Sequence, residues 1–270
     1  MLENVLQIRD IEHFHWRLAE TESRISFSGN GIGLSLAAAV ELASIATHWH
    51  ADSNAPPTVI RVNGCRLWSL MGAARWPGRR NRTKLRDGDL AVIVLPSTSD
   101  PWWTQCLREL LDELKSNGFS PRLARSLAGA VMEMADNVWQ HSQSTLPGLV
   151  AYQIRRRRFA FSVADTGIGI LASLRRNQQY RHLSSSMEAI RSAIEPGVSG
   201  HEDGNGMGYP SLLHALAELW GTARIRSGEA GFLIDRTGDQ RRKQSVYLPQ
   251  LPGVHVSVRC GLDPPSGSKA

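Results

Sequence analysis

The sequence predicts an α/β protein with a small α/β domain over residues 1–117, a larger α/β domain over residues 118–262 and a disordered tail over residues 263–270. Short apolar runs bounded by glycine or proline alternate with longer segments of helical apolar spacing, and this alternation predicts both strands and helices. The sequence also marks the boundary between two predicted helices. Asn117-Gly118 is typical of a helix end, and Ser120-Pro121 is typical of a helix start.

The first half of the chain alternates between the two kinds of element. The predicted strands are residues 24–28, 58–62 and 90–95, and the predicted helices are residues 34–48 and 102–116. The basic, glycine-containing stretch 75–86 is predicted to be a loop.

The second half begins with a long helix. The predicted helices are residues 121–142 and 207–220, and the predicted strands are residues 149–154, 158–164, 222–227, 231–236 and 254–259. A long polar stretch, residues 171–203, has no predicted element.

Composition narrows the class of protein. The hydrophobic share of 41% and charged share of 21% are ordinary for a soluble globular chain, and no apolar run is long enough for a membrane span. Three scattered cysteines without a CxxC pair favour neither a disulfide framework nor a zinc site. With no secretion signal at the N-terminus, we expect a cytoplasmic protein.

The helix at residues 121–142 carries a stripe of polar side chains. Its members recur at offsets of three, four, seven and eight residues, which places them on one helix face. They are Glu133, Asp136, Asn137, Gln140 and His141. The flanking sequence is too apolar for a merely solvated helix, so a polar ligand is expected against the stripe. Carboxylate and amide oxygens suit Mg²⁺.

A second motif is an aspartate that a predicted strand delivers into a glycine turn. Asp165 ends the apolar run, and Gly167 and Gly169 follow it. Glycine permits dihedral angles and a close backbone approach that a Cβ atom forbids. A buried carboxylate here is able to accept a hydrogen bond from an exocyclic amine, which would select adenine over guanine.

A third motif, Gly204-Asn-Gly206-Met207-Gly208, opens a predicted helix. Exposed backbone N–H groups at a helix N-terminus, together with the helix dipole, form a site suited to phosphates.

In this order, the three motifs resemble the GHKL ATPase superfamily, which includes DNA gyrase B subunits, MutL repair proteins, Hsp-type chaperones, sensor histidine kinases and anti-sigma-factor serine kinases. The resemblance covers residues 120–261. It implies a two-layer α/β sandwich of the Bergerat type, with a mixed sheet and helices on one face. It also implies that the chain binds ATP with Mg²⁺.

The resemblance assigns a role to each motif. Glu133 matches the general base that orients a water or hydroxyl group toward the γ-phosphate, Asn137 matches the Mg²⁺ ligand, and Asp165 matches the adenine-reading acid. The other expected pocket residues are Asp136, His141, Gly167, Gly169, Gly204, Gly206, Met207 and Gly208. Residues 171–203 match the mobile lid, whose arginines at 175, 176 and 181 are candidates for phosphate contacts.

The use of ATP has several interpretations. We expect a slow regulatory ATPase switch that acts on a protein partner through the N-terminal domain. Turnover is expected to be slow because gyrase-like enzymes take a lysine from a following domain, whereas only Lys243 and Lys269 occur late in this sequence. The alternatives are a serine/threonine protein kinase of the anti-sigma-factor type and an interaction module that binds nucleotide without hydrolysing it.

Each motif also has a plain structural explanation. The helix stripe is compatible with a solvated face, Asp165 with an ordinary turn aspartate and the glycines at 204–208 with a flexible linker. For His141, a structural role competes with an acid–base role.

Arginine clusters raise the question of a charged partner. Net charge is +6, and arginine far outnumbers lysine. Residues 155–158 are four consecutive arginines between two strands, and five more lie in the stretch 75–86. Both clusters are interpreted either as solvated surface or as a contact for nucleic acid or an acidic partner. The N-terminal domain is loosely similar to STAS-like domains. The sequence leaves open whether the chain forms a homodimer.

Overall fold

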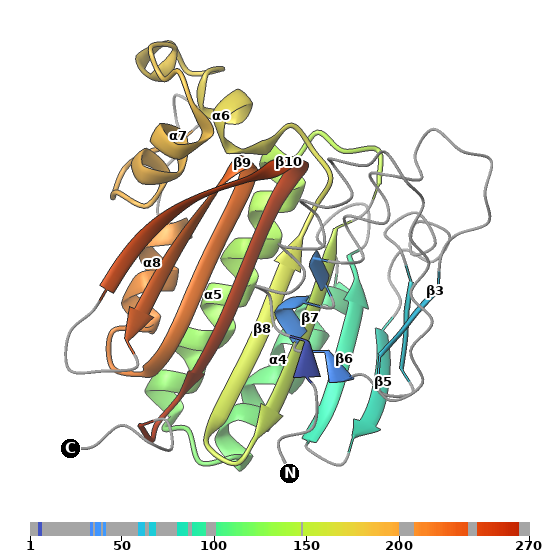
Figure 1. Ribbon diagram of the computed structural model, residues 1–270. Helices are drawn as coiled ribbons and strands as arrows, with labels where there is room; N and C mark the ends of the chain where they lie inside the picture. The colour runs from blue at the N-terminus through green and yellow to red at the C-terminus, as the bar shows by residue number, and fades with distance from the viewer. Residues whose placement is uncertain are drawn as a thin grey trace.

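A six-stranded antiparallel sheet forms the centre of the protein, with strand order β5-β6-β7-β8-β10-β9 (Figure 1). The computed structural model describes residues 5–6, 33–34, 36–38, 40–41, 59–62, 65–68, 80–85, 88–95, 101–146, 148–199, 208–236 and 242–264. The prediction of an α/β protein with a sandwich architecture is confirmed. The expected mixed sheet is not seen, because each pairing within the six-stranded sheet is antiparallel.

The strands of this sheet differ greatly in length. They are β5 (Arg80–Leu85), β6 (Gly88–Val94), β7 (Leu149–Arg155), β8 (Arg158–Ala164), β9 (Trp220–Arg236) and β10 (Arg242–Gly261). Two small pairs lie outside it: β1 (Val5–Leu6) is parallel to β2 (Gly33–Leu34), and β3 (Val59–Val62) is antiparallel to β4 (Cys65–Trp68).

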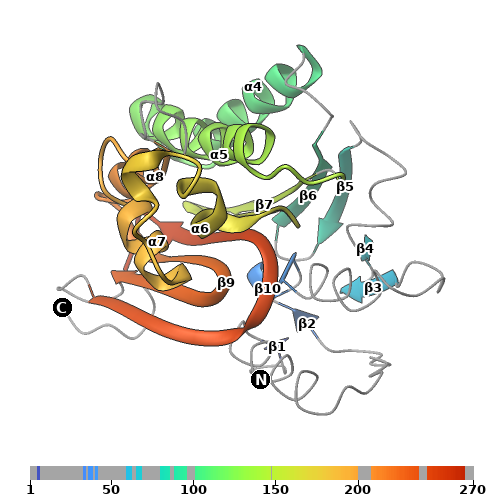
Figure 2. The same cartoon turned by 90° about the horizontal axis from the view of Figure 1, so that it is seen from above.

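Helices cover one face of the sheet, as Figure 2 shows from above. Among the described residues from 101 onward, the helical elements are α4 (Pro101–Ser116), α5 (Pro121–His141), α6 (Gly169–Leu174), the 3₁₀ helix η1 (Gln178–Tyr180), α7 (Ser186–Ala193) and α8 (Gly208–Ala215). Helices α4, α5 and α8 lie behind the strands, whereas α6 and α7 lie at one end of the sheet. None of the helices in the described ranges has the length and apolar character needed to cross a bilayer.

Alternation along the strands explains the two layers. On β8, Phe159, Phe161 and Val163 point into the core beneath the helices, where Phe159 and Phe161 have ring centroids 5.4 Å apart. Ser162 and Ala164 alternate with them along the strand and therefore face the other side of the sheet, since successive strand side chains point to opposite faces. The helix-covered face is called the inner face below, and the opposite side the outer face.

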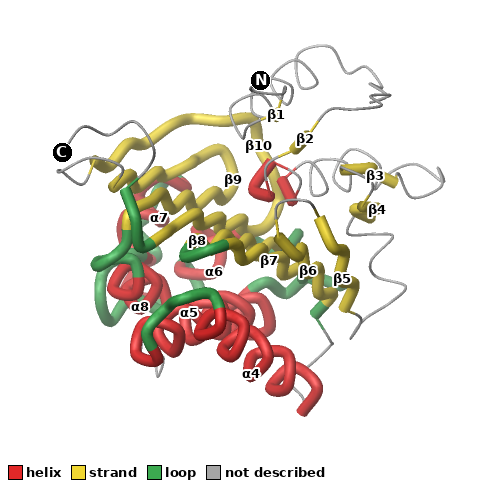
Figure 3. Tube along the Cα trace, turned by 90° about the horizontal axis from the view of Figure 1, so that it is seen from below, coloured by secondary structure: helices red, strands yellow, loops and turns green. Residues whose placement is uncertain are grey.

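A short helical segment, described at residues 36–38 and 40–41, covers part of the outer face (Figure 3). Its Val40 is fully buried against Leu149, Ala151 and Ala164, which come from β7 and β8. The N-terminal segment therefore packs on the side of the sheet that the long helices leave uncovered.

The ends of α4 and α5 confirm the predicted helix boundary. Gly118 adopts a φ of +93° just after α4, a left-handed conformation that favours glycine. Ser120 caps α5, and its hydroxyl oxygen accepts a hydrogen bond from the backbone N–H of Leu123 at 3.3 Å. Both ends follow from local chemistry, which is why the sequence locates them well.

The boundary expected between residues 117 and 118 does not divide the described core. Strand β6 pairs with β7 along its length, and α4 packs on α5 in the same hydrophobic cluster. The described parts of residues 80–116 thus share one sheet and one core with residues 118–262. Asp263, the first residue of the expected tail, contacts Arg157 at 3.1 Å, and residues 265–270 lie outside the described residues.

Several expected elements have other boundaries. Part of the loop expected at residues 75–86 is strand β5, and the strands expected at 222–227 and 231–236 form the single strand β9. The polar stretch 171–203 contains η1 and α7 as well as most of α6, because its scattered apolar residues reach the core. Residues 34–48 are helical at 36–38 and 40–41, and the strand expected at 24–28 lies outside the described residues.

Candidate functional site

Helix α5 positions the acidic and amide side chains that the sequence singles out. Its apolar residues, including Leu127, Val131 and Met134, are buried in the core. Glu133 and Asp136 lie on the other side and are half-buried. Burial raises the pKa of both carboxyl groups, and the neighbouring charge of Asp136 raises that of Glu133 further. A carboxylate with a raised pKa is a better proton acceptor near neutral pH than an exposed one.

Asn137 and His141 continue the same face of α5 toward its C-terminal end, and both are half-buried. The side-chain amide nitrogen of Asn137 is buried and has no hydrogen-bond partner among the described residues. A half-turn of the amide group exchanges its oxygen and nitrogen, so this side chain is able to present either atom here. A buried amide of this kind is a candidate ligand group.

Asp165 follows directly after β8 and is 4% exposed. Its backbone N–H donates to the carbonyl oxygen of Val254 at 3.0 Å, and its carboxylate accepts a hydrogen bond from the N–H of Gly167 at 2.7 Å. Burial raises the pKa of the Asp165 carboxyl to about 7, although hydrogen bonds from the backbone of Gly167 and Val254 oppose the rise. This carboxyl group therefore changes charge near physiological pH.

The glycine turn holds Asp165 against the end of α5. The N–H of Ile168 donates to the carbonyl oxygen of Ser142 at 2.8 Å, and the hydroxyl groups of Ser144 and Thr166 are 3.0 Å apart. A Cβ atom on Gly167 would overlap the backbone of Ser142. Glycine is required at 167 because two backbone segments meet there, and this contact joins the first two sequence motifs.

The start of α8 brings part of the third motif to the same place. Gly208 is the first residue of α8, which packs on α5. The side chain of Tyr209, the next residue, is close enough to Asp165 for their charges to interact. Burial and then the Asp165 charge raise the pKa of the Tyr209 phenol. Gly204, Gly206 and Met207 lie outside the described residues.

Two residues that the sequence did not indicate also hold the Asp165 turn. Gly253, with a φ of +82°, passes so close to Asp165 that a Cβ atom would overlap the Asp165 carbonyl group. The hydroxyl of Ser227 accepts a hydrogen bond from the N–H of Ile170 at 2.9 Å and donates to the carbonyl of Gly253 at 3.2 Å. The Pro252-Gly253 dipeptide is a turn signal within a strand pattern, but nothing local marks Ser227.

The segment expected to be the lid forms a helical layer in its described part. Helix α7 begins with a capping box formed by Ser185 and Glu188, and Ile190 is fully buried in the core. The side chain of Arg175 donates from Nε to the carbonyl of Leu183 at 2.8 Å. Arg175, Arg176 and Arg181 are exposed.

A pocket of about 440 Å³ opens between α6 and the middle parts of β9 and β10, at residues 227–229 and 250–253. Gly169, Ser227 and Gly253, which surround the Asp165 turn, form part of its wall together with Arg175 and Glu229. The pocket therefore borders the turn.

The side chains at this site limit how an Mg²⁺ ion would be bound. Among the described residues, no cluster of three or more histidine, cysteine, aspartate or glutamate side chains is arranged to hold a metal ion. Mg²⁺ at nucleotide sites usually takes one or two protein oxygens and completes its shell with phosphate oxygens and water. The buried amide of Asn137 fits such a sparse donor set.

The arginine run forms the tip of the β7–β8 hairpin. Arg155 is paired opposite Arg158, and Arg156 and Arg157 form the turn with φ values of 33° and 60°. The backbone of Arg157 is held by Asn117 and Leu262 at hydrogen-bond distances of 3.0 Å. This hairpin tip lies at the end of the sheet opposite to Asp165, because β8 runs from Arg158 to Ala164.

The sequence matches no protein-family model, and it has no significant similarity to a curated protein. The function of this site is therefore inferred from its own residues and geometry.

Proposed function

We propose that the chain binds ATP together with Mg²⁺ at the site formed by α5, the Asp165 turn and the start of α8, and that it uses ATP slowly as a regulatory switch. The observation that carries this proposal is the meeting of separated motifs. The buried Asp165 turn packs on the end of α5, and Tyr209 at the start of α8 is within electrostatic reach of the same carboxyl group.

Asp165 supplies the base-reading end of the proposed site. When ionised, its carboxylate accepts a hydrogen bond from an exocyclic amino group, which adenine carries at the position where guanine has a carbonyl oxygen. The carbonyl oxygen of guanine is itself an acceptor, so it would face the carboxylate without a hydrogen bond. An unpaired buried polar group costs about 1–3 kcal/mol. ATP is therefore preferred over GTP.

Helix α5 leads from the base to the phosphates. Ser142, at the end of α5, contacts the Asp165 turn. Glu133 precedes Ser142 by nine residues, which is about 13 Å along a helix axis. A nucleotide with its base at Asp165 would thus extend along α5 toward Asn137 and Glu133. Asn137 would hold Mg²⁺ through its amide oxygen, and the ion would offset the charge of the phosphates. The N–H groups at the start of α8 favour an anion by their dipole.

Glu133 acts as the general base in this proposal. Its carboxylate accepts a proton from a water molecule, or from a hydroxyl group of a protein substrate, as oxygen attacks the γ-phosphate. The raised pKa of Glu133 supports this role because burial strengthens a carboxylate as a proton acceptor. Since a base alone contributes about 10²–10⁴-fold, we expect turnover below about 1 s⁻¹ for the isolated chain.

The test of binding is a thermal-unfolding titration with ATP, ADP and GTP, with and without Mg²⁺. We expect ATP with Mg²⁺ at about 100 times its dissociation constant to add roughly 2.7 kcal/mol to the free energy of unfolding. GTP should add less. Asp165→Asn should lose the ATP effect, whereas Asp112→Asn, which changes an exposed aspartate on α4, should keep it. Absence of stabilisation by any nucleotide would contradict the proposal.

The test of turnover uses Glu133→Ala. This variant should still be stabilised by ATP with Mg²⁺ but should lose phosphate release by at least about 100-fold. Release of free phosphate from ATP by the wild-type chain supports the hydrolytic switch. If Glu133→Ala released phosphate at the wild-type rate, Glu133 would not be the base.

A further inference from the structure

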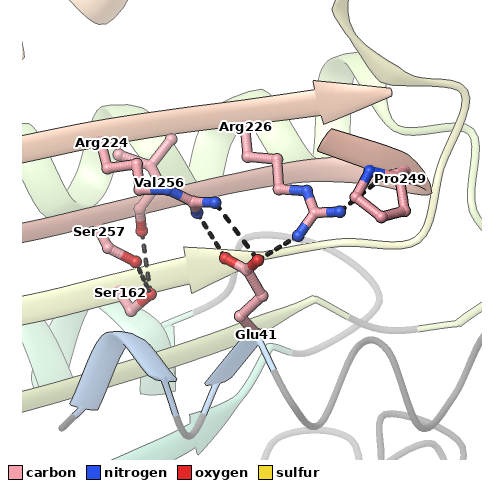
Figure 4. Close-up of polar contacts among 7 residues, drawn as sticks. All are labelled: Glu41, Ser162, Arg224, Arg226, Pro249, Val256 and Ser257. Atoms are coloured by element: carbon pink, nitrogen blue, oxygen red, sulfur yellow. Dashed lines mark hydrogen bonds and ion pairs between the residues drawn. The ribbon is translucent and has the colours of Figure 1, made fainter. Parts of the chain in front are cut away.

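A buried ion-pair cluster joins the N-terminal segment to the outer face of the sheet (Figure 4). Glu41, at the end of the described helical segment, pairs with both Arg224 and Arg226 of β9. Arg224 reaches the two carboxylate oxygens with its two terminal nitrogens. Glu41 is 1% exposed and Arg226 is fully buried, so this contact is enclosed by protein.

The negative charge of Glu41 is well compensated by its two arginine partners. Burial alone would raise the pKa of Glu41, but the guanidinium groups of Arg224 and Arg226, and then His255, lower it to about 2. Glu41 therefore stays ionised over the whole physiological range. Removing Glu41 would leave two buried guanidinium groups without their counter-charge, so the contact holds the segment firmly on the sheet.

Besides its ion pair with Glu41, Arg226 makes a second contact. Its other terminal nitrogen donates to the carbonyl oxygen of Pro249 at 2.7 Å. Pro249 lies in an irregular part of β10, where the pairing with β9 shifts register between Tyr247 and Val254. One planar guanidinium group thus links the N-terminal segment to this bulge, which lysine with its single ammonium group cannot reproduce.

The same bulge shapes the Asp165 turn. Gly253 ends it with a φ of +82° and lies directly against the backbone of Asp165. Ser227, the neighbour of Arg226 on β9, projects to the inner side and bonds Ile170 and Gly253. A shift of Arg226 would therefore act on the turn by two routes, through Pro249 on β10 and through Ser227 on β9.

We propose that Arg226 is a positioning residue for Asp165, and that the N-terminal segment tunes nucleotide selection by holding Arg226 through Glu41. This inference rests on the proposed function, because it takes Asp165 as the base-reading group. Docking of the segment and binding of ATP then stabilise each other. By thermodynamic linkage, anything that withdraws Glu41 from the sheet weakens ATP binding by the factor with which ATP tightens the docking.

The test compares two substitutions on one strand in the full-length chain. Arg226→Lys keeps a positive charge near Glu41 but loses the simultaneous reach to Pro249. Arg224→Lys makes the same chemical change two residues away and leaves the Arg226 bridge in place. Glu41→Gln is the second variant, because it weakens the hold on Arg226 while both arginines remain. The measured quantity is the ratio of the dissociation constants for GTP and ATP, each with Mg²⁺.

We expect Arg226→Lys and Glu41→Gln to reduce the preference for ATP over GTP about 10-fold, in the usual range of coupling between sites. Arg224→Lys should keep the wild-type ratio. A general loss of stability would lower the melting temperature of both lysine variants, but the ratio of the dissociation constants for GTP and ATP would then be the same in both. The selectivity ratio thus distinguishes positioning from a structural role.

Two failures are distinguishable. If the wild-type chain binds neither nucleotide, the proposed function is wrong and this inference falls with it. If the wild-type chain prefers ATP, and Arg226→Lys and Glu41→Gln keep that preference, the site is as proposed but Arg226 does not position Asp165. Equal loss of preference in both lysine variants would also overturn the inference.

Discussion

At the scale of single residues, Asp165 is a carboxyl group in an environment very different from water. It combines nearly complete burial with a pKa of about 7, against an ordinary value of 3.8. Folding therefore keeps a proton on this carboxyl at pH values where the unfolded chain has already released it. A proton held by the folded state alone makes stability fall as pH rises, here between about pH 4 and pH 7.

Asp165→Asn should reveal this cost. At pH 5 both proteins carry an uncharged side chain at this position in the folded state, so their difference in the free energy of unfolding sets the baseline. Between pH 5 and pH 8 the variant should gain about 2–3 kcal/mol relative to wild type, because only wild type must ionise a buried carboxyl group. Urea unfolding at the two pH values measures this change. A difference that does not vary with pH would show that Asp165 titrates normally.

At the scale of elements, the β7–β8 hairpin is closed by a turn that its residues disfavour. Arg156 and Arg157 both have positive φ values, as the two central residues of a type I′ turn do. Non-glycine residues pay about 1–2 kcal/mol each for this conformation, and asparagine followed by glycine suits it best. Backbone contacts from Asn117 and Leu262 hold the turn in place.

Replacing the turn by Arg156→Asn with Arg157→Gly should raise stability by about 1 kcal/mol. The exposed contact of Arg157 with Asp263 is lost, but such a pair contributes only about 0–1 kcal/mol. Differential scanning calorimetry should show a melting temperature about 2–4 °C higher. The control is Arg156→Ala with Arg157→Ala, which removes the same charges without relieving the backbone. Equal stabilisation in both would assign the effect to charge.

At the scale of the whole molecule, the Glu41 cluster joins segments far apart in the chain. Glu41→Ala should lower the free energy of unfolding by about 3–5 kcal/mol, because Arg224 and Arg226 stay buried without their carboxylate. Glu218→Ala breaks an ion pair with Arg122 whose side chains are 55% and 65% exposed, and it should cost about 0–1 kcal/mol. Guanidinium unfolding compares the two. Similar losses would mean that the N-terminal segment contributes little to the fold.

Local chemistry explains which elements the sequence predicts well. The ends of α4 and α5, the strands β7 and β8 and the glycine turn after Asp165 each depend on residues within a few positions of one another. The α6–α7 layer was missed because its apolar residues are spaced among many polar ones. Their burial becomes evident only once the sheet edge and α5 are in place.

The sequence by itself determined the order of the motifs, the polar stripe on α5 and the need for glycine beside Asp165, because these follow from helical periodicity and backbone geometry. Only the tertiary structure decided that β5 and β6 share one sheet with the second half, that β6 and α4 share its core, and that the sheet is antiparallel. It alone brought Glu41 to Arg226 and Ser227 to the Asp165 turn. Such pairs are separated by dozens of residues or more, and no local pattern encodes a contact that depends on how strands register.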